Sequence, residues 1–355
     1  MKIVHIYKKH YDSGDGITNV ASNLLHYQSK KSSKHQFIDM PFSFDNKKKA
    51  KNEYGYVGLV GLLTKLIKEK PDVIYLHGFF YIQFLILGIF CFFLKAKFIF
   101  VPHCSLIKRA MEYKAVRKKV YFNIFSFIYK HKIHFIQFLN EDEKNSSQIF
   151  KFTPEYFIVP NGVNVSDLSC LPFEQLSMFY LGRCDINHKG LDILLQYMRN
   201  ESVNQSLDIF GASDNEAKKL KDLIIDNNIN DKIKLFKPVF DMEKEKVFCS
   251  HNIFILLSRY EGLPISVLEA LSYGCICLLS SGTNMSAEVV NNNCGFRVDT
   301  LNDFICALEY IQQMDVYEIE RMSQNAKELV KNKYSWYSIT DITISQLDEL
   351  EYKNN

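Results

Sequence analysis

The chain has 355 residues, 47% of them hydrophobic, which is enough for two globular domains. It contains no repeated or low-complexity segment, which argues against a disordered or repeat protein, and its start (MKIVHIY) does not resemble a signal peptide. Nine scattered cysteines without CxxC spacing argue against a zinc site or a disulfide framework, and for reduced thiols in the cytoplasm.

Charge is divided unevenly along the chain. Residues 1–165 carry 25 Lys and Arg against 12 Asp and Glu, a net charge of +13, whereas residues 166–355 carry 18 against 28, a net charge of −10. We therefore expect the first half to meet an anionic partner, such as a membrane face, a phosphorylated acceptor or a nucleic acid. Nucleic acid is the weakest of these, because no RNP, helix-turn-helix or zinc-finger pattern accompanies the charge.

Short apolar runs alternate with segments of helical length in the first half. Strands are predicted at 2–7, 72–77, 97–103, 134–140 and 156–161, and helices at 17–30, 57–70, 79–94, 108–131 and 141–150. Asn140 followed by Glu143 has the spacing of a capping box and predicts a helix start. This alternation favours a mostly parallel sheet covered by helices.

Two of these helices bear on membrane association. Residues 79–94 (FFYIQFLILGIFCFFL) carry no charge but are shorter than the ~20 residues that a span needs, so a crossover helix, buried or touching a membrane, is favoured. Residues 108–132 mix bases with Tyr and Phe. That composition fits either a helix on an anionic membrane surface or an ordinary solvated basic face.

The second half repeats the alternation. Strands are predicted at 177–183, 207–211, 232–238, 252–258 and 275–280, and helices at 189–199, 214–227, 241–250, 264–273, 300–314 and 336–352. Turn signals without a clear period make 162–175 the predicted linker. Two doubly wound domains follow, and ligands are expected beyond the carboxyl ends of their strands and in a central cleft.

The first strand of each half is followed by residues suited to an anionic ligand. In DSGDGITNV, residues 12–20, Gly14 and Gly16 allow a tight turn and close approach of a ligand to a helix start, although a simple turn is as good an interpretation. In LGRCDINHKG, residues 181–190, Arg183 and Lys189 converge at a strand end, where they are able to neutralise a diphosphate. Either alone would more often be a solvated surface charge.

The stretch SRYEGLPISVLEALSYG, residues 258–274, joins a strand to a helix. Pro264 suits the first helical position. The backbone donors expected at this turn are those of Gly262, Leu263 and Ile265. Glu261 in the turn and Glu269 on the helix are good acceptors for sugar and ribose hydroxyls. A surface acid and a salt-bridged helix acid are the alternatives.

One first-half histidine also ends a predicted strand. His103, in VPHCS, lies where a doubly wound sheet places its ligands, so a role at the reaction centre and a structural role are equally open.

In these segments the sequence resembles the retaining glycosyltransferases of the GT-B fold, in the group called glycosyltransferase family 4. The resemblance spans most of the chain and is most specific in the E-x7-E spacing with EGLP. The segments that carry it are PNGVN (160–164), LGRCDINHKGLDILL (181–195), LDIFG (207–211), SRYEGLPISVLEALSYG (258–274), SGTNMSAEVVNNNCGFRV (281–298) and YSW (334–336).

The resemblance implies roles for the second-half residues. Arg183 and Lys189 would hold the nucleotide diphosphate, Glu269 would bind the ribose hydroxyls, and Glu261 with the turn 262–265 would contact the donor sugar. It also implies two Rossmann-like domains, 1–165 on the acceptor side and 166–335 for the nucleotide sugar. A final helix, 336–355, would cross back to the first domain.

The resemblance also assigns roles in the first half. Gly16 would approach the diphosphate, and His103 would lie near the reaction centre. No metal or other cofactor is implied. The loop SGDGI departs from the plain Gly-Gly pair of the family, and GTNMSAE departs from its Gly-Gly before an acid, which puts the role of Glu288 in doubt.

The sequence thus predicts transfer of a hexose or N-acetylhexosamine, with retained configuration, from a nucleotide diphosphate sugar. UDP is the favoured nucleotide, and a lipid-linked or surface-polysaccharide acceptor at the cytoplasmic face of a membrane is the favoured acceptor. The alternatives are a nucleotide-sugar epimerase, a soluble glucan-type transferase and a non-catalytic partner subunit of the same fold.

Overall fold

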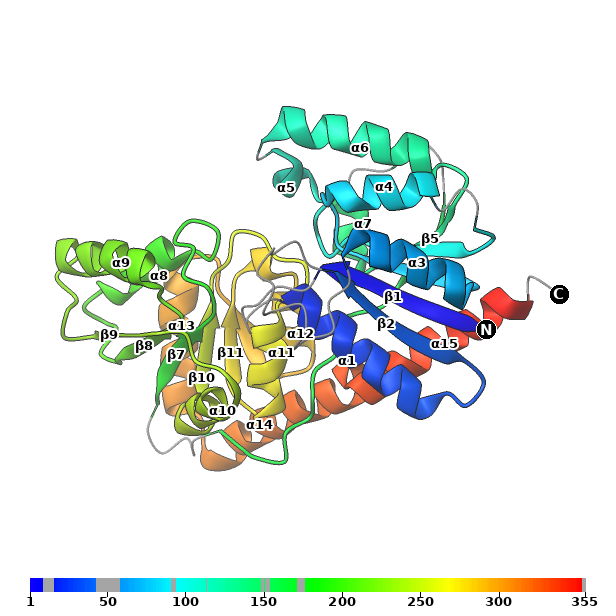
Figure 1. Cartoon of the computed structure of the whole chain (residues 1–355). Coiled ribbons are helices and arrows are strands. Elements are labelled where there is room, and N and C mark those ends of the chain that lie inside the picture. The colour runs from blue at the N-terminus through cyan, green and yellow to red at the C-terminus, as the bar shows by residue number, and fades with distance from the viewer. Residues whose placement is uncertain are drawn as a thin grey trace. The chain divides into compact units, whose positions relative to one another are not determined.

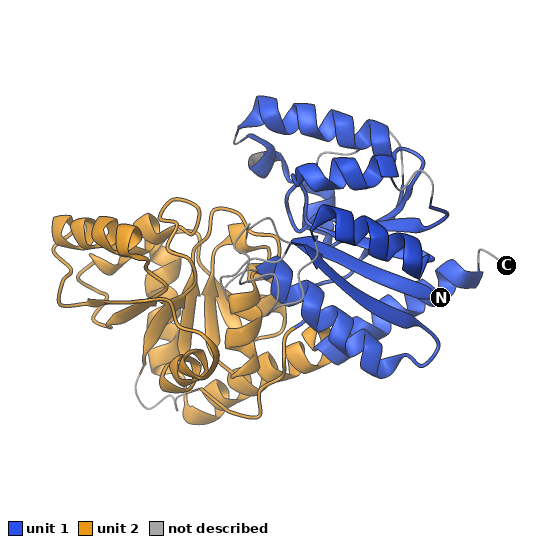
Figure 2. Cartoon of the chain, in the orientation of Figure 1, with its two compact units in different colours: residues 1–162, 336–355 blue, residues 163–335 orange. Residues whose placement is uncertain are grey.

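The computed structural model describes most of the chain. It covers residues 1–8, 16–42, 58–90, 94–112, 114–147, 150, 154–170 and 176–352, with residue 109 described by its backbone alone. The chain forms two compact units, coloured separately in Figure 2. Unit 1 comprises Met1–Gly162 and Trp336–Asn355, and unit 2 comprises Val163–Ser335. The sequence had led us to expect divisions after residues 165 and 335.

Unit 1 is built on a parallel sheet of six strands, labelled in part in Figure 1. They are β1 (Lys2–Lys8), β2 (Gln36–Phe42), β3 (Val73–His77), β4 (Lys97–Val101), β5 (Ile133–Phe138) and β6 (Glu155–Ile158). Their order in the sheet is β2-β1-β3-β4-β5-β6. Because all run in one direction, the segments that follow neighbouring strands emerge at the same edge.

Helices cover both faces of this sheet. They are α1 (Gly16–Lys31), α3 (Leu59–Glu69), α4 (Ile82–Phe90), α5 (Lys108–Glu112), α6 (Ala115–Tyr129), α7 (Glu141–Ser146) and α15 (Trp336–Tyr352). Alternate strand residues face different layers. Ile74 and Phe98 belong to a core with residues of α3, α4 and α6, whereas Val73 and Ile99 belong to another with Leu347 of α15.

Helix α15 belongs to unit 1 although it follows unit 2 in the chain. It packs beside α1, as Figure 1 shows. The ring of Trp336, at its start, stacks on Tyr27 with centroids 6.2 Å apart. A Cβ at Gly162 would lie 2.4 Å from the Trp336 ring, so glycine alone fits where the chain leaves unit 1.

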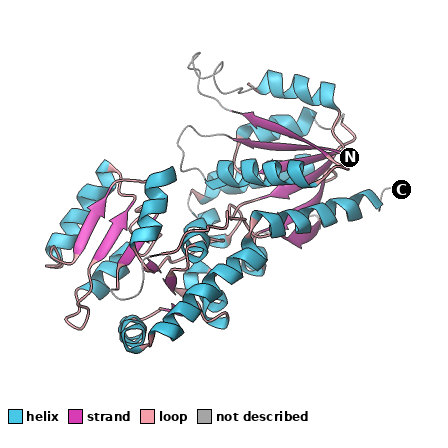
Figure 3. Cartoon of the chain, turned by 90° about the horizontal axis from the view of Figure 1, so that it is seen from below, coloured by secondary structure: helices cyan, strands magenta, loops and turns pink. Residues whose placement is uncertain are grey.

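Unit 2 has a second parallel six-stranded sheet, in the order β12-β11-β10-β7-β8-β9. Its strands are β7 (Met178–Leu181), β8 (Leu207–Phe210), β9 (Ile233–Phe236), β10 (Ile253–Leu256), β11 (Ile276–Leu279) and β12 (Gly295–Arg297). Its α-helices are α8 (Leu191–Met198), α9 (Asp214–Asp226), α10 (Asp241–Ser250), α11 (Ile265–Ser272), α12 (Ser286–Asn291), α13 (Leu301–Gln313) and α14 (Val316–Leu329). Strands and helices are distinguished by colour in Figure 3.

The central strands of unit 2 are buried on both faces, and this burial accounts for their apolar sequences. Every residue of β7, β10 and β11 is buried, which requires apolar side chains on both faces and produces the unbroken runs MFYL, IFIL and ICLL. A short 3-10 turn (Ser281–Thr283) and a π turn (Val330–Tyr334) complete the unit.

Several predicted elements need correction. The prediction of a single helix at 108–131 is wrong. Lys114 adopts a left-handed backbone conformation, with φ of 56°, and this residue separates α5 from α6. Strands β2 and β12 and helices α12 and α14 were not predicted. The start of the predicted linker is an isolated bridge between Val163 and Ser335, and residues 171–175 lie outside the described part.

The uncharged segment 79–94 forms the nine-residue helix α4, and residues 91–93 lie outside the described part. Within the described ranges, no helix combines the length and the apolar character needed to cross a bilayer.

Candidate active site

Lys189 and Glu261 form an ion pair at the carboxyl edge of the unit 2 sheet. Lys189 follows β7 and Glu261 follows β10, and the Lys189 Nζ donates to Glu261 Oε1 over 2.5 Å. The two side chains are only 14% and 12% exposed. The structure therefore brings together two residues that the sequence had assigned separately to the diphosphate and to the sugar.

Gly190 makes this approach possible. Its φ is +65°, and a Cβ there would lie 2.0 Å from the carbonyl oxygen of Leu257, at the end of β10. Any side chain would push the start of α8 away from β10. The Lys-Gly pair therefore works as a unit, in which the glycine sets the position of the lysine beside Glu261.

Glu261 has further partners that the sequence did not reveal. Ser258 Oγ donates to Glu261 Oε1 over 2.7 Å, and Asn284 Nδ2 donates to the Glu261 backbone carbonyl over 2.7 Å. His188 Nε2 lies 4.0 Å from the same carboxylate oxygen. Glu261 is thus held by groups on three segments, two at its carboxylate and one at its backbone, which suits a residue that orients a ligand.

The turn before Glu261 is fastened to the Lys189 loop. Arg259 binds Asp192 through two hydrogen bonds of 2.8 and 2.7 Å, and its guanidinium lowers the pKa of the Asp192 carboxyl. The His188 ring stacks on Tyr260 with centroids 4.1 Å apart. Such paired planar contacts fix geometry. We infer that these contacts keep the Lys189 side chain within bonding distance of Glu261.

Arg183 lies at the end of β7 with an exposed side chain. Within the described residues it forms no ion pair. Its backbone carbonyl accepts a 2.6 Å hydrogen bond from Tyr180 Oη, which fixes the turn while leaving the guanidinium at the surface. The position suits an anion-binding residue, but the structure does not bring Arg183 into the Lys189–Glu261 cluster.

The turn Gly262–Ile265 leads into α11. The helix start predicted at Pro264 needs one correction. Pro264 is the residue before the helix (φ −72°, ψ 114°) and not its first residue, which is Ile265. Gly262, Leu263 and Pro264 are buried. Among the described residues, the backbone N–H groups of Leu263 and Ile265 meet no acceptor, as expected at a helix start.

Glu269 lies on α11 and pairs with a residue of α10. Lys244 Nζ donates to Glu269 Oε1 over 2.6 Å. Burial raises the pKa of the Glu269 carboxyl, and the nearby ammonium offsets part of that rise. The salt-bridged helix acid considered from the sequence is therefore present. The same pairing orients a carboxylate that is able to accept hydroxyls.

Of the first-half candidates, Gly16 and His103 are described, whereas Gly14 lies outside the described residues. Gly16 is the exposed first residue of α1. His103 follows β4 and, like Cys104, has a left-handed backbone, with φ of 48° and 62°. Two consecutive non-glycine residues in this region are unusual and need support from their surroundings.

Glu143 supplies that support. Its carboxylate accepts the Cys104 N–H over 2.5 Å and the Leu139 N–H over 2.6 Å, while its own N–H donates to Asn140 Oδ1. The side chain is buried, and burial raises the pKa of its carboxyl. The helix start predicted at Asn140 is confirmed. The Glu143 carboxylate, however, accepts from Cys104 and Leu139, so it stabilises the turn beside His103.

Glu288, whose role was in doubt, forms an ion pair with Lys333, whose Nζ lies 2.7 Å from Glu288 Oε1. This contact ties α12 to the π turn of unit 2. It gives Glu288 a structural partner, and it does not place this residue in the Lys189–Glu261 cluster.

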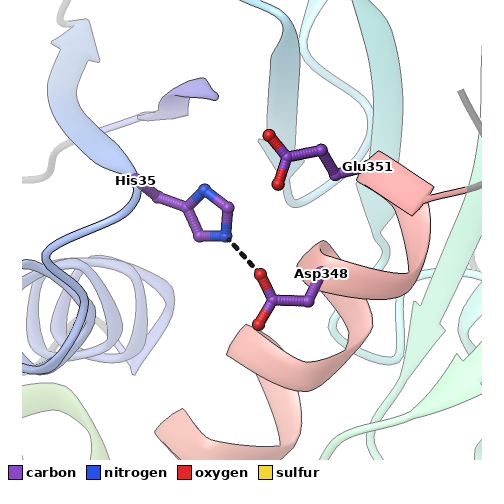
Figure 4. Close-up of side chains that lie close together, drawn as sticks. All are labelled: His35, Asp348 and Glu351. Atoms are coloured by element: carbon purple, nitrogen blue, oxygen red, sulfur yellow. Dashed lines mark hydrogen bonds and ion pairs between the residues drawn. The ribbon is translucent and has the colours of Figure 1, made fainter. Parts of the chain in front are cut away.

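One group of described residues has ligand atoms close enough for a cation. The side chains of His35, Asp348 and Glu351, drawn in Figure 4, place their ligand atoms within 4.8 Å of one another. Lys34 already pairs with both carboxylates, at 2.9 and 2.8 Å, and lowers the pKa of each. Because an ammonium neutralises both acids, we interpret the group as a clamp between α15 and the start of β2.

The part of the chain that carries this cluster is similar to a known protein family. Residues 172–329 match the family model described as Glycosyl transferases group 1. Unit 2 is a glycosyl transferases group 1 domain. The matched residues include Lys189, Glu261 and Glu269, so the cluster lies inside the family domain. The enzyme class of the chain is therefore glycosyltransferase.

Two relatives in bacteria are similar over different lengths. An uncharacterized 41.2 kDa protein in the cps region of Klebsiella pneumoniae is 23% identical over 291 residues, which cover 77% of this chain and 78% of that protein. The UDP-Gal:alpha-D-GlcNAc-diphosphoundecaprenol alpha-1,3-galactosyltransferase of Escherichia coli is 34% identical over 87 residues, 24% of this chain and 22% of that enzyme.

Solved structures share the whole architecture. Sucrose-phosphate synthase from Thermosynechococcus elongatus superposes with a TM-score of 0.78 at 15% identity, over all of both chains. HepE from Anabaena, in complex with UDP-glucose, has a TM-score of 0.75 at 12% identity, over 98% of this chain and all of that one. The predicted GT-B fold of two Rossmann-like units is confirmed.

Proposed function

We propose that this glycosyltransferase is a retaining enzyme of glycosyltransferase family 4. It would move a hexose or N-acetylhexosamine from a UDP-sugar to a hydroxyl of a lipid-linked or surface-polysaccharide acceptor, in cell-envelope glycan synthesis. The observation that carries the proposal is the enclosed Lys189–Glu261 pair, which offers a cation and an acceptor at one sheet edge. A UDP-glucose complex of a protein with the same fold favours this nucleotide.

The proposed reaction breaks the bond between the anomeric carbon and the β-phosphate oxygen. A bond forms between the same carbon and the acceptor oxygen, on the face that the phosphate leaves. The acceptor proton passes to an oxygen of the departing diphosphate. The products are the glycosylated acceptor and UDP, and no added base is required.

The chain would contribute electrostatic stabilisation and orientation. Negative charge develops on the β-phosphate as the bond breaks, and Lys189 and Arg183 would neutralise it together with the N–H groups of the turn before α11. Glu261 would orient the sugar through its hydroxyls, while Glu269 would hold the ribose. This arrangement neutralises the diphosphate with protein groups and assigns no role to a metal.

A surface of unit 1 supports an acceptor at a membrane. Helices α4 and α6 pack together and expose apolar side chains along one stripe of each. These side chains are Ile82, Ile86 and Ile89 of α4, and Val116, Val120, Ile124 and Phe127 of α6. Exposed bases of the same region are Lys114, Arg117 and Lys119. Mixed apolar and basic surface is typical of binding to anionic lipid.

One experiment tests the main proposal. The purified protein is incubated with UDP-, GDP- and dTDP-sugars and with membrane lipid extract, and nucleotide release and glycolipid products are followed. We expect release from a UDP-sugar only when an acceptor is present. Isomerised sugar from donor alone would identify an epimerase. No release and no nucleotide binding by calorimetry would overturn the transferase and leave a partner subunit.

A second experiment tests the membrane surface. Phe127 is 84% exposed on α6, and Tyr317 is 82% exposed on α14 of the acidic half. We expect Phe127→Asp to reduce co-sedimentation with anionic vesicles, and Tyr317→Asp to leave it unchanged. Binding that is equal for neutral and anionic vesicles, or insensitive to salt, would contradict an electrostatic contribution.

A further inference from the structure

The loop at residues 280–284, which follows β11, lies against the backbone of the turn that carries Glu261. Ser280 Oγ donates to the Ser258 carbonyl over 2.7 Å, and Asn284 Nδ2 donates to the Glu261 carbonyl over 2.7 Å. These two hydrogen bonds reach both ends of the turn. The loop therefore holds the main chain of the turn, whereas the ion pair described above acts on the Glu261 side chain.

The same loop is tightly packed and bonded within itself. A Cβ at Gly282 would lie 2.3 and 2.5 Å from two carbonyl oxygens of the turn, so the two main chains are in contact. Thr283 has no exposed surface, and its Oγ1 donates to the Ser280 carbonyl over 2.7 Å. The Asn284 N–H donates to the Ser281 carbonyl over 3.2 Å. A loop fixed in this way is able to impose one position on the turn.

Asn284 has a left-handed backbone, with φ of 57° and ψ of 13°. Asparagine is one of the few residues besides glycine that adopt this conformation, because its short polar side chain forms local hydrogen bonds. Here the side chain bonds to the neighbouring turn. The residue thus combines the conformation that ends the 3-10 turn with a hydrogen-bond donor for Glu261.

The partner atom determines the direction of the Asn284 amide. A backbone carbonyl only accepts hydrogen bonds, so the atom that faces the Glu261 carbonyl is Nδ2. Within the described ranges of the chain, Asn284 is the one donor to this carbonyl. The position of the Glu261 main chain therefore depends on this amide.

We propose that Asn284 is a positioning residue, which sets where the Glu261 carboxylate meets the donor sugar. Asn284 holds the main chain from which the carboxylate projects, while Lys189 and Ser258 bind the carboxylate itself. The acceptor for the sugar hydroxyls is then in place before the sugar arrives. This inference rests on the proposed function, in which Glu261 orients the donor sugar.

Two variants isolate the hydrogen bond. Asn284→Gly removes the side chain and leaves a residue that adopts the left-handed conformation without strain. Asn228→Gly is the matched control, because Asn228 is also left-handed, with φ of 55°, and lies exposed in unit 2 just after α9. Both variants replace the same residue type in the same conformation, and Asn284→Gly alone removes a bond to Glu261.

The first measurement needs no donor. Amide proton–nitrogen spectra of the free protein report the Gly262 N–H, which belongs to the same peptide group as the Glu261 carbonyl. Because a hydrogen bond to a carbonyl polarises its peptide group, we expect this signal to move in Asn284→Gly and to stay in place in Asn228→Gly. An unmoved Gly262 signal in a folded Asn284→Gly protein would overturn the inference.

The second measurement compares a nucleotide with and without its sugar. We expect Asn284→Gly to lower kcat/KM for the preferred UDP-sugar by about tenfold, the effect of one hydrogen bond, and to leave the Kd of UDP within about twofold. We expect Asn228→Gly to change neither quantity. An unchanged kcat/KM, or an equal loss of affinity for UDP, would contradict a role in placing the sugar.

The two measurements also separate this inference from the proposed function. A protein that shows the expected Gly262 shift but releases nucleotide from no donor would refute the proposed function alone. An active transferase whose Asn284→Gly variant keeps the original Gly262 signal and kcat/KM would refute this inference alone.

Discussion

The two units place polar groups at the carboxyl edges of similar sheets by different means. In unit 1 the groups are histidines, and His5 of β1 and His77 of β3 are fully buried, which lowers their pKa values. In unit 2 they are ion pairs, Lys189 with Glu261 and Lys244 with Glu269, whose side chains keep 12% to 27% of their surface exposed. Full burial favours neutral hydrogen bonding, whereas partial exposure permits charge.

This difference matches what each unit would have to do. A diphosphate is a strong anion and needs positive charge close by, and in unit 2 the proposed source of that charge is Lys189, which Glu261 holds in an ion pair. A sugar hydroxyl needs a hydrogen-bond donor or acceptor and no charge, which a neutral imidazole is able to provide.

Lys189→Ala should have the largest effect. It removes the cation proposed to stabilise the leaving diphosphate and leaves Glu261 without its ion pair. We expect turnover to fall by about 10²–10³-fold, the usual effect of losing one stabilising group at the developing charge. Steady-state kinetics with the preferred donor provide the measurement, and turnover within twofold of the unaltered protein would refute the role.

Acid should destabilise unit 1 through its neutral histidines. Burial lowers the folded pKa values of His5 and His77 below the ordinary 6.5, so the unfolded chain binds more protons as the pH falls below 6.5, and for His5 this window extends to about 3. Each histidine should lower the free energy of unfolding by about 1.4 kcal/mol per pH unit in that window. The raised pKa of Glu143 acts in the opposite direction.

His5→Phe isolates this contribution, because phenylalanine retains the stacking of His5 on Tyr75, whose centroids lie 4.4 Å apart. Denaturant unfolding between pH 7 and 5 should show a pH slope reduced by about 1.4 kcal/mol per unit in the variant. An unchanged slope would mean that His5 is protonated in the folded protein.

Glu143→Gln should cost about 1–3 kcal/mol of unfolding free energy, because the amide cannot accept the N–H groups of Leu139 and Cys104 with both of its ends. Chemical denaturation measures the loss. Glu141→Gln on the same helix is the control, since Glu141 is exposed and forms a surface ion pair with Lys144. Equal effects of the two variants would remove the special role of Glu143.

Lys333→Ala should have the smallest effect. It breaks the ion pair with Glu288, in which the lysine is 52% exposed, and such pairs contribute less than about 1 kcal/mol. Turnover should not change. The variant is the matched control for Lys189→Ala, since both remove a lysine from a carboxylate in unit 2. A comparable loss of activity would place Glu288 in the site after all.

Much of the fold was predictable because parallel strands and amphipathic helices have distinct periods. The last helix, predicted at 336–352, is Trp336–Tyr352, and the strand predicted at 2–7 is Lys2–Lys8. Strand β2 was missed because its sequence, QFIDMPF, contains Asp and Pro, which are uncommon in strands. The division between α5 and α6 depends on one backbone angle at Lys114, which no periodicity reveals.

The candidate site was predictable as a set of residues but not as a set of contacts. The motif around Glu261 placed it in a turn, yet its pairing with Lys189 joins segments 72 residues apart. His5 and His77 look like ordinary strand residues, and only the sheet order β1-β3-β4 brings them into line with His103. Long-range pairing of this kind follows from topology, which local patterns do not encode.

The chain enters unit 2 at Val163 and leaves it at Ser335, and these two ends of unit 2 lie side by side. Val163 N–H donates to the Tyr334 carbonyl over 2.8 Å, and Val163 pairs with Ser335. Gly162 and Trp336 likewise meet in unit 1. Unit 2 is therefore an insertion with adjoining ends, and a gene that joins residue 162 to residue 336 through a short linker should encode unit 1 alone, while residues 163–335 should be expressible as unit 2.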